Sequence, residues 1–184
     1  HTAYRRQRQM CIRDSSMGGM LAQILSINKN ASIIKMVLSC THKGYSMKYN
    51  KPLREPYNKR LHERHKLSDV EYGKLRISKM LPGLQDKEIF DFLCLISQET
   101  SSEAIVCGGS SMQILDTTDV LPKIKIPCLI LTGSEDIVVS KEKSLFLYDK
   151  IKNALHIEIK GVGHAPYCEN ALEFNEKISS FLST

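Results

Sequence analysis

The chain has 184 residues, of which 42% are apolar and 25% charged, and its formal net charge is +6. This length and composition suffice for one ordinary domain with a buried core and exclude a disordered chain. No run approaches the roughly 20 apolar residues of a membrane span, and no apolar stretch follows the basic N-terminus as in a secretory leader. The six cysteines form no CxxC pair and no zinc pattern, so we expect a reducing, cytoplasmic location.

The positive charge is concentrated at the N-terminus. Residues 1–15 hold four arginines and one aspartate, which supply half of the net charge. The remaining chain is only mildly basic and has no basic helix or aromatic–basic motif. We therefore expect no binding to nucleic acid.

The first 15 residues have an unusual origin on one interpretation. Residues 10–15 read MCIRDS, which resembles an in-frame translation of a transposon adaptor used in sequencing libraries. On this hypothesis residues 1–15 are a non-native head, which is set aside when the fold is predicted. The alternative is a native basic tail.

The pattern after this head alternates between strands and helices. A tight turn opens into a helix over residues 16–25, and the apolar residues 33–40 predict a buried strand. Residues 43–118 are rich in charged residues and tyrosine, with broken helical patterns, and predict a set of helices. Strands are then expected at 126–133 and 154–160, and helices at 140–150 and 170–182.

This order predicts an α/β fold with a parallel sheet wrapped by helices. Residues 16–43 and 119–184 would together form a discontinuous core. Residues 44–118 would form a helical cap inserted between its two parts.

Three polar residues follow predicted strands or a predicted turn, where active sites of open α/β sheets lie. Ser16 stands at the turn before the first helix, Asp136 follows the strand that ends at Gly133, and His164 follows the strand that ends near Lys160. A serine hydroxyl is a weak nucleophile unless a histidine takes its proton, and the histidine needs a carboxylate to fix its tautomer. The order Ser–Asp–His therefore predicts nucleophilic catalysis.

The motifs around these residues read SMGG from Ser16, TGSED from Thr132 and GVGHAP from Gly161. In this order they resemble the α/β-hydrolase family, which carries a nucleophile elbow and a triad in the same chain order. The resemblance covers residues 16–184 and implies the C-terminal two-thirds of such an enzyme, with the N-terminal strands missing. Leu81-Pro82-Gly83 and the insert length look most like the branch of 3-oxoadipate enol-lactonase relatives and carboxylesterases.

The resemblance implies a role for each residue. Ser16 would be the nucleophile, His164 the general base, Asp136 the orienting acid, and the backbone N–H of Met17 one oxyanion donor. The substrate would be a small-molecule ester or lactone, with no cofactor and no metal. Because the family's second oxyanion donor comes from an earlier loop, we expect the 184-residue chain to be inactive and poorly soluble.

One residue departs from the family pattern. The glycine expected two residues before the nucleophile is Asp14. An aspartate there should crowd the sharp turn and bury a charge. If residues 1–15 are not native, the conflict disappears.

Simpler interpretations remain open for each residue. Ser16 could be only a helix N-cap, and Glu135 and Asp119 are rivals for the triad acid. We expect Cys40 and Cys168 to be packing residues. The other histidines would be surface or cap residues, although His42 could line the pocket: His42, His62, His65 and His156.

Two other functions also remain open. The same scaffold supports C–C bond hydrolysis, perhydrolysis or lyase chemistry. A non-catalytic ligand-binding protein with a hydrolase-like fold is the third possibility. The oligomeric state is not predicted.

Overall fold

The structure is a computed structural model that describes residues 10–29 and 31–183. Within these residues four strands form one parallel sheet in the order β1-β2-β3-β4. The strands are β1 (Met10–Ser15), β2 (Ile33–Ser39), β3 (Cys128–Gly133) and β4 (Ala154–Ile159). Because neighbouring parallel strands need a crossover, a helix lies between each pair. The predicted parallel sheet is confirmed.

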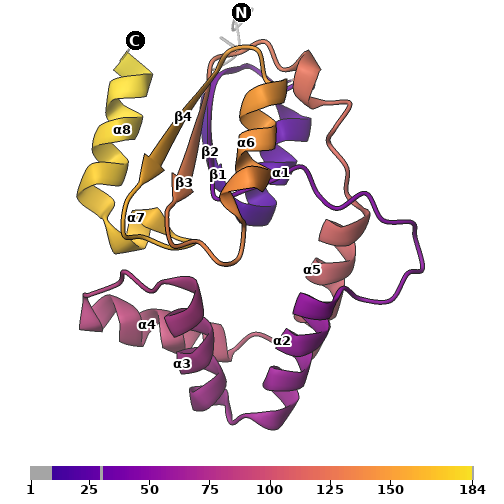
Figure 1. The fold of residues 1–184 in the computed structure, drawn as a ribbon, viewed down its shortest axis with the longest axis vertical. Helices are drawn as coiled ribbons and strands as arrows, with labels where there is room; N and C mark the ends of the chain where they lie inside the picture. Colours follow the sequence, from indigo (N-terminus) through magenta and orange to yellow (C-terminus); the bar gives the residue numbers. More distant parts are fainter. Residues whose placement is uncertain (1–9, 30, 184) are drawn as a thin grey trace, which may run out of the picture.

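Helices cover both faces of the sheet (Figure 1). On one face lie α1 (Ser16–Leu25) and α6 (Lys141–Lys150), and on the other lies α8 (Ala171–Ser183). Side chains of a strand alternate between faces, so Met36 and Leu38 pack in the cluster with α1 and α6, whereas Val37 packs against α8. Burial of both faces explains why β2 and β3 are nearly continuous apolar runs.

The segment between β2 and β3 is helical, as predicted. It contains α2 (Glu55–Lys66), α3 (Asp69–Met80), α4 (Lys87–Gln98) and α5 (Ser102–Ile114). Figure 1 shows these helices below the end of the sheet at which β2 and β3 end. Side-chain caps fix the starts of α3, α4 and α5, because Ser68, Asp86 and Ser101 each accept a backbone N–H of the first turn.

Three elements were not predicted from the sequence. A 3₁₀-helix, η1, spans Leu121–Lys123, and a short helix, α7, spans Pro166–Glu169. The third is β1, which lies in residues 10–15. The other residues of the proposed head, 1–9, lie outside the described part of the chain, so the non-native origin of residues 1–15 stays a hypothesis.

The helices of the described residues are too short or too polar to cross a membrane.

Candidate active site

The turn between β1 and α1 holds Ser16 in an unusual backbone conformation. Its φ is +52°, in the left-handed region that residues other than glycine rarely adopt. Such strain persists where the surrounding structure enforces it, and it is frequent at active sites. Ser16 begins α1, with the exposed Met17 following it, so the free N–H groups of the first turn lie beside the Ser16 side chain. The tight turn that opens into a helix at this position is as the sequence predicted.

The expectation for Asp14 is wrong in one respect. The residue is exposed on the edge strand β1, so no charge is buried at the elbow. Its carboxylate accepts the N–H of Ser15 at 2.8 Å and lies against Gly18, where a Cβ would come within 2.0 Å of Asp14 Oδ1. The Asp14 carboxylate therefore fits only because Gly18 has no side chain. The expected crowding would appear if residue 18 carried a Cβ.

Asp136 and His164 meet beyond the ends of β3 and β4. His164 Nδ1 lies 2.9 Å from Asp136 Oδ2, and both side chains are almost fully buried. The other oxygen, Oδ1, accepts the backbone N–H groups of Val138 and Val139. Burial by itself raises the pKa of Asp136, but His164 and the two amides outweigh it and lower the pKa. Asp136 is therefore an ionised carboxylate that fixes the orientation of the His164 ring.

The loop after β2 joins the Ser16 turn to the loop that carries His164. We call residues 160–165, between β4 and α7, the histidine loop. Thr41 Oγ1 donates to the carbonyl of Ser16 at 2.5 Å, and the neighbouring Cys40 Sγ lies 3.8 Å from the carbonyl of Gly163. Cys40 itself has φ +46°. Adjacent residues of one loop thus contact Ser16 and Gly163, the residue before His164. Within the described part of the chain, no hydrogen bond joins Ser16 Oγ to His164, and such contacts are often loose in ligand-free sites.

The cysteines near the site have the properties of packing residues. Burial, followed by the charge of Asp136, raises the pKa of Cys40 to about 12. Burial and Glu169 raise the pKa of Cys168, which packs beside α3 and α4. Both thiols therefore stay protonated, which disfavours nucleophilic chemistry. Cys40, Asp136 and His164 are the one group of possible metal ligands among the described residues, with ligand atoms within 4.8 Å.

Sequence reasoning missed Glu169. Its carboxylate accepts the N–H groups of Gly163 at 2.8 Å, Ala165 at 3.3 Å and Gly83 at 2.8 Å. The first two flank His164, and the third lies between α3 and α4. Beside them, the N–H of His164 donates to the carbonyl of Met80 at 2.8 Å. Glu169 therefore fastens the histidine loop to the helical segment, and its distance of 86 residues from Gly83 hides this in the sequence.

The rival residues lie elsewhere. Glu135 and Asp119 are exposed, and the Glu135 carboxylate accepts a hydrogen bond from Ser134. His62 and His65 are exposed on α2, and His156 lies on β4 in contact with Thr132. His42, for which a surface or cap role or a place in the pocket was expected, is not at the surface: it is only 4% exposed and directly follows Thr41. Neither Glu135 nor Asp119 takes the place of Asp136 beside His164.

The fold and these loops define a class: a parallel sheet covered by helices, with a strained serine turn and a buried aspartate–histidine pair at the strand ends, as in α/β hydrolases. Residues 2–170 match the family model described as "Serine aminopeptidase, S33", and the chain belongs to this family of α/β hydrolases. No curated protein matches the chain.

Solved structures with the same fold include several hydrolases. An esterase from Exiguobacterium antarcticum has 17% identity and a TM-score of 0.81, and the match covers 96% of this chain and 67% of that one. An enol-lactonase from Burkholderia xenovorans has 17% identity and a TM-score of 0.79, covering 97% and 67%. A bromoperoxidase from Bacillus anthracis has 20% identity and a TM-score of 0.82, covering 96% and 68%. The chain thus spans about two thirds of the length of these proteins.

Proposed function

We propose that this protein is a serine hydrolase that cleaves a carboxylic ester or lactone through an acyl-enzyme intermediate. The observation that carries the proposal is the buried contact of 2.9 Å between His164 Nδ1 and Asp136 Oδ2. The loop after β2 bonds both the Ser16 turn and Gly163, the residue before His164. With Nδ1 engaged by the aspartate, Nε2 is left for the serine.

The reaction follows from this arrangement. His164 Nε2 takes the proton of Ser16 as Oγ forms a bond to the carbonyl carbon. The N–H of Met17 binds the resulting oxyanion, while Asp136 stabilises the imidazolium. Collapse breaks the bond to the alcohol, which leaves with the proton from His164, and water then releases the acyl group by the same steps in reverse roles. No step requires a cofactor.

Covalent labelling tests the proposal without depending on turnover. A fluorophosphonate forms a bond from Ser16 Oγ to phosphorus and expels fluoride, and His164 accepts the serine proton, so only an activated serine reacts. We expect intact-mass analysis to find one label on Ser16 of the 184-residue chain. Ser16→Ala and His164→Ala should remove it, and Ser15→Ala should retain it.

An unlabelled folded chain would overturn the proposal, as would a label that persists in Ser16→Ala. Ester hydrolysis is measured in parallel. Because one oxyanion donor is worth on the order of 100- to 1000-fold in turnover, low hydrolysis together with labelling of Ser16 would fit a nucleophile that lacks its second donor.

A non-catalytic ligand-binding role is the second candidate, and Asp14 is the observation that favours it. A carboxylate stands where the family's elbow has glycine, and it lies against Gly18. The same labelling decides between the two functions, because a binding protein leaves Ser16 unreactive.

A further inference from the structure

Four basic side chains come from the start of α2, from α2 and α3 of the helical segment, and from α6. They are half-buried, and none forms an ion pair with a carboxylate in the described part of the chain. We call them the cation cluster: Arg54, Arg60, Arg76 and Lys143.

Arg54 and Lys143 share one tyrosine. The Arg54 guanidinium carbon lies 3.5 Å from the centre of the Tyr45 ring, and Lys143 Nζ lies 3.5 Å from the Tyr45 hydroxyl. Arg54 immediately precedes α2, whereas Lys143 belongs to α6 on the sheet. Both cations thus approach the same ring from opposite sides of the boundary between helices and sheet.

Arg60 and Arg76 form the other half of the cluster. Arg60 Nε donates to the Tyr72 hydroxyl at 3.0 Å, a neutral partner. Burial, followed by the charge of Arg60, lowers the pKa of Arg76 to about 10. The Glu63 carboxylate, which acts in the opposite direction on Arg76, is bonded to Lys79 at 2.7 Å. Arg76 therefore keeps its charge in a partly desolvated place without an anion of its own.

The cluster adjoins the candidate site through two connections. The Tyr45 ring lies 4.6 Å from that of His42, which follows Thr41, the residue bonded to Ser16. Arg76 stands one helical turn before Met80, whose carbonyl accepts the N–H of His164.

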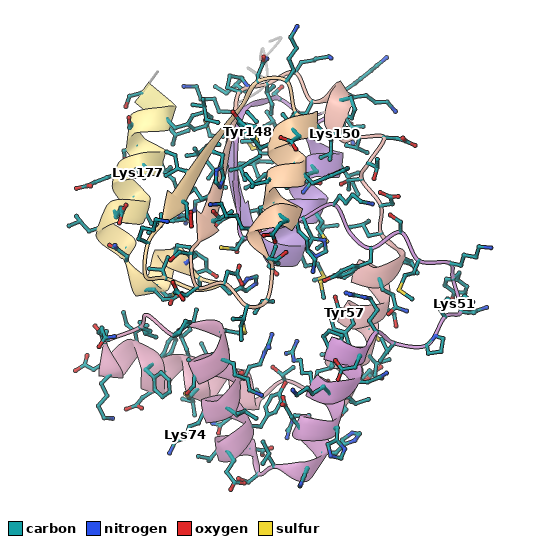
Figure 2. All side chains as sticks on the ribbon, in the orientation of Figure 1. Lys51, Tyr57, Lys74, Tyr148, Lys150 and Lys177 are labelled. Carbon is teal, nitrogen blue, oxygen red and sulfur yellow. The ribbon has the colours of Figure 1, made fainter. Side chains whose placement is uncertain are left out.

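Figure 2 shows how labelled side chains of α2 and α3 are oriented. Lys74 projects outward from α3, and Arg76, two residues later, must point to nearly the opposite side of the same helix. Tyr57, between Arg54 and Arg60 in sequence, lies near the junction of α2 and α5, whereas Lys51 extends away from the molecule.

Elsewhere in the helical segment, half-buried basic side chains are paired with carboxylates. Arg64 bonds Asp69 at 2.7 Å and Lys43 bonds Asp116 at 3.2 Å. Arg54 and Lys143 also affect His42: burial, together with the charges of Lys143, Arg54 and Lys43, lowers the pKa of His42 to about 4. A desolvated cation without a partner is costly, and such groups beside a catalytic centre commonly serve a ligand.

We propose that the cation cluster binds a carboxylate carried by the substrate, so that the hydrolase acts on anionic esters or lactones. This inference rests on the proposed function and specifies its substrate class. Arginine suits the role because its planar guanidinium binds a carboxylate with two parallel hydrogen bonds. The Tyr45 hydroxyl, which accepts from Lys143, would add a donor beside Arg54.

The test compares two amides that differ in one end group and resist hydrolysis. Glutaric acid monoanilide ends in a carboxylate, and pentanoic acid anilide has an equal chain length and ends in a methyl group. Isothermal titration calorimetry on the full chain measures their affinities. We expect the carboxylate to bind at least about tenfold tighter, and its affinity to fall with added salt.

Variants connect the preference to the cluster. Arg54→Met and Arg76→Met keep side-chain bulk and remove the charge, and each should weaken binding of the monoanilide by about 10- to 100-fold while leaving the neutral anilide unchanged. Arg76→Lys should restore part of the affinity. Lys59→Met is the matched control, because Lys59 is an exposed cation on α2 without an ion pair among the described residues; it should bind like the parent.

Thermal unfolding of each variant identifies one that fails to fold, in which case the other variant carries the test. Equal affinity for the two amides, or binding of neither, overturns the inference, as does selectivity that survives both methionine variants. The labelling of Ser16 is independent of these results. If Ser16 is labelled but the carboxylate is not preferred, the serine hydrolase proposal stands and the anionic substrate class is wrong. If binding depends on the arginines but Ser16 is not labelled, the protein has an anion site and is not a serine hydrolase.

Discussion

At single positions, the environment and not the residue type decides the chemistry around the candidate site. His42 and His164 are both almost fully buried and both follow a strand of the sheet. His164 faces the Asp136 carboxylate, whereas His42 is surrounded by cations and accepts the N–H of Gly44 on Nδ1 at 3.0 Å. His42 is therefore a neutral acceptor, suited to packing and unsuited to proton transfer near neutral pH.

This difference predicts how stability depends on pH. Burial and the charges of Lys143, Arg54 and Lys43 lower the pKa of His42 from 6.5 to about 4. Between these values the unfolded chain binds a proton that the folded chain does not, so stability falls as the pH falls. The loss should reach about 3 kcal/mol near pH 4.

His42→Asn should remove this component, because asparagine accepts the Gly44 N–H without titrating. Urea unfolding of both proteins across this pH range measures it. Parallel loss of stability in the parent and the variant would show that His42 does not titrate in this way.

Among the secondary-structure elements, α7 and the turn between α3 and α4 hold the histidine loop. Glu169 of α7 accepts the N–H of Gly83 in this turn and the N–H of Gly163 in the histidine loop. The turn and the loop approach so closely that no side chain fits between them, because a Cβ on Gly83 would lie 2.3 Å from the Gly161 carbonyl. The position of His164 therefore depends on the docking of the helical segment. Any movement of α3 against the sheet would be transmitted to the histidine.

We predict that Glu169→Gln loosens this docking. A glutamine has one acceptor oxygen and turns an amide NH₂ toward N–H groups that then lack a partner, which should cost about 1–3 kcal/mol. Fluorophosphonate labelling of Ser16 should slow in proportion to the loss of His164 alignment. Glu176→Gln on the exposed side of α8 is the control, and equal labelling rates in both variants would show that Glu169 acts on stability alone.

In the whole molecule, the side of the sheet at β1 has an unusual surface. Within the described residues β1 pairs only with β2, so its other edge offers unpaired backbone groups. Next to it α1 exposes Leu21 by 55%, Leu25 by 41% and Ile24 by 40%, around a surface hollow that Ile12 also lines. An edge strand beside an apolar patch favours association between molecules.

We therefore expect the 184-residue chain to self-associate through this side. Leu21→Lys should shift its sedimentation toward the monomer, because the charge would have to be buried at the contact. Leu172→Lys is the matched control on α8, where the leucine is 74% exposed and lies on the other face of the sheet. A parent chain that is monomeric, or variants that behave alike, would contradict this expectation.

Local patterns in the sequence were enough to predict the strands after residue 32, the helical segment, the turn at Ser16, and the places of Asp136 and His164 after β3 and β4. These features depend on apolar periodicity and on residues that close a strand, such as Gly133, and both act over a few neighbouring positions. The exposed setting of Asp14 was not predictable in this way, because it depends on whether another strand pairs with β1.

The tertiary structure decided what depends on distant residues meeting. Glu169 gains its role only because Gly83 and Gly163 come together around its carboxylate. Arg54 and Lys143 come together only because the folded chain brings both to Tyr45, whereas in the sequence they are ordinary members of a charged chain. Apolar periodicity reports which side of an element is buried but not which element covers it, so pairings across 60 to 90 residues appear only in the folded chain.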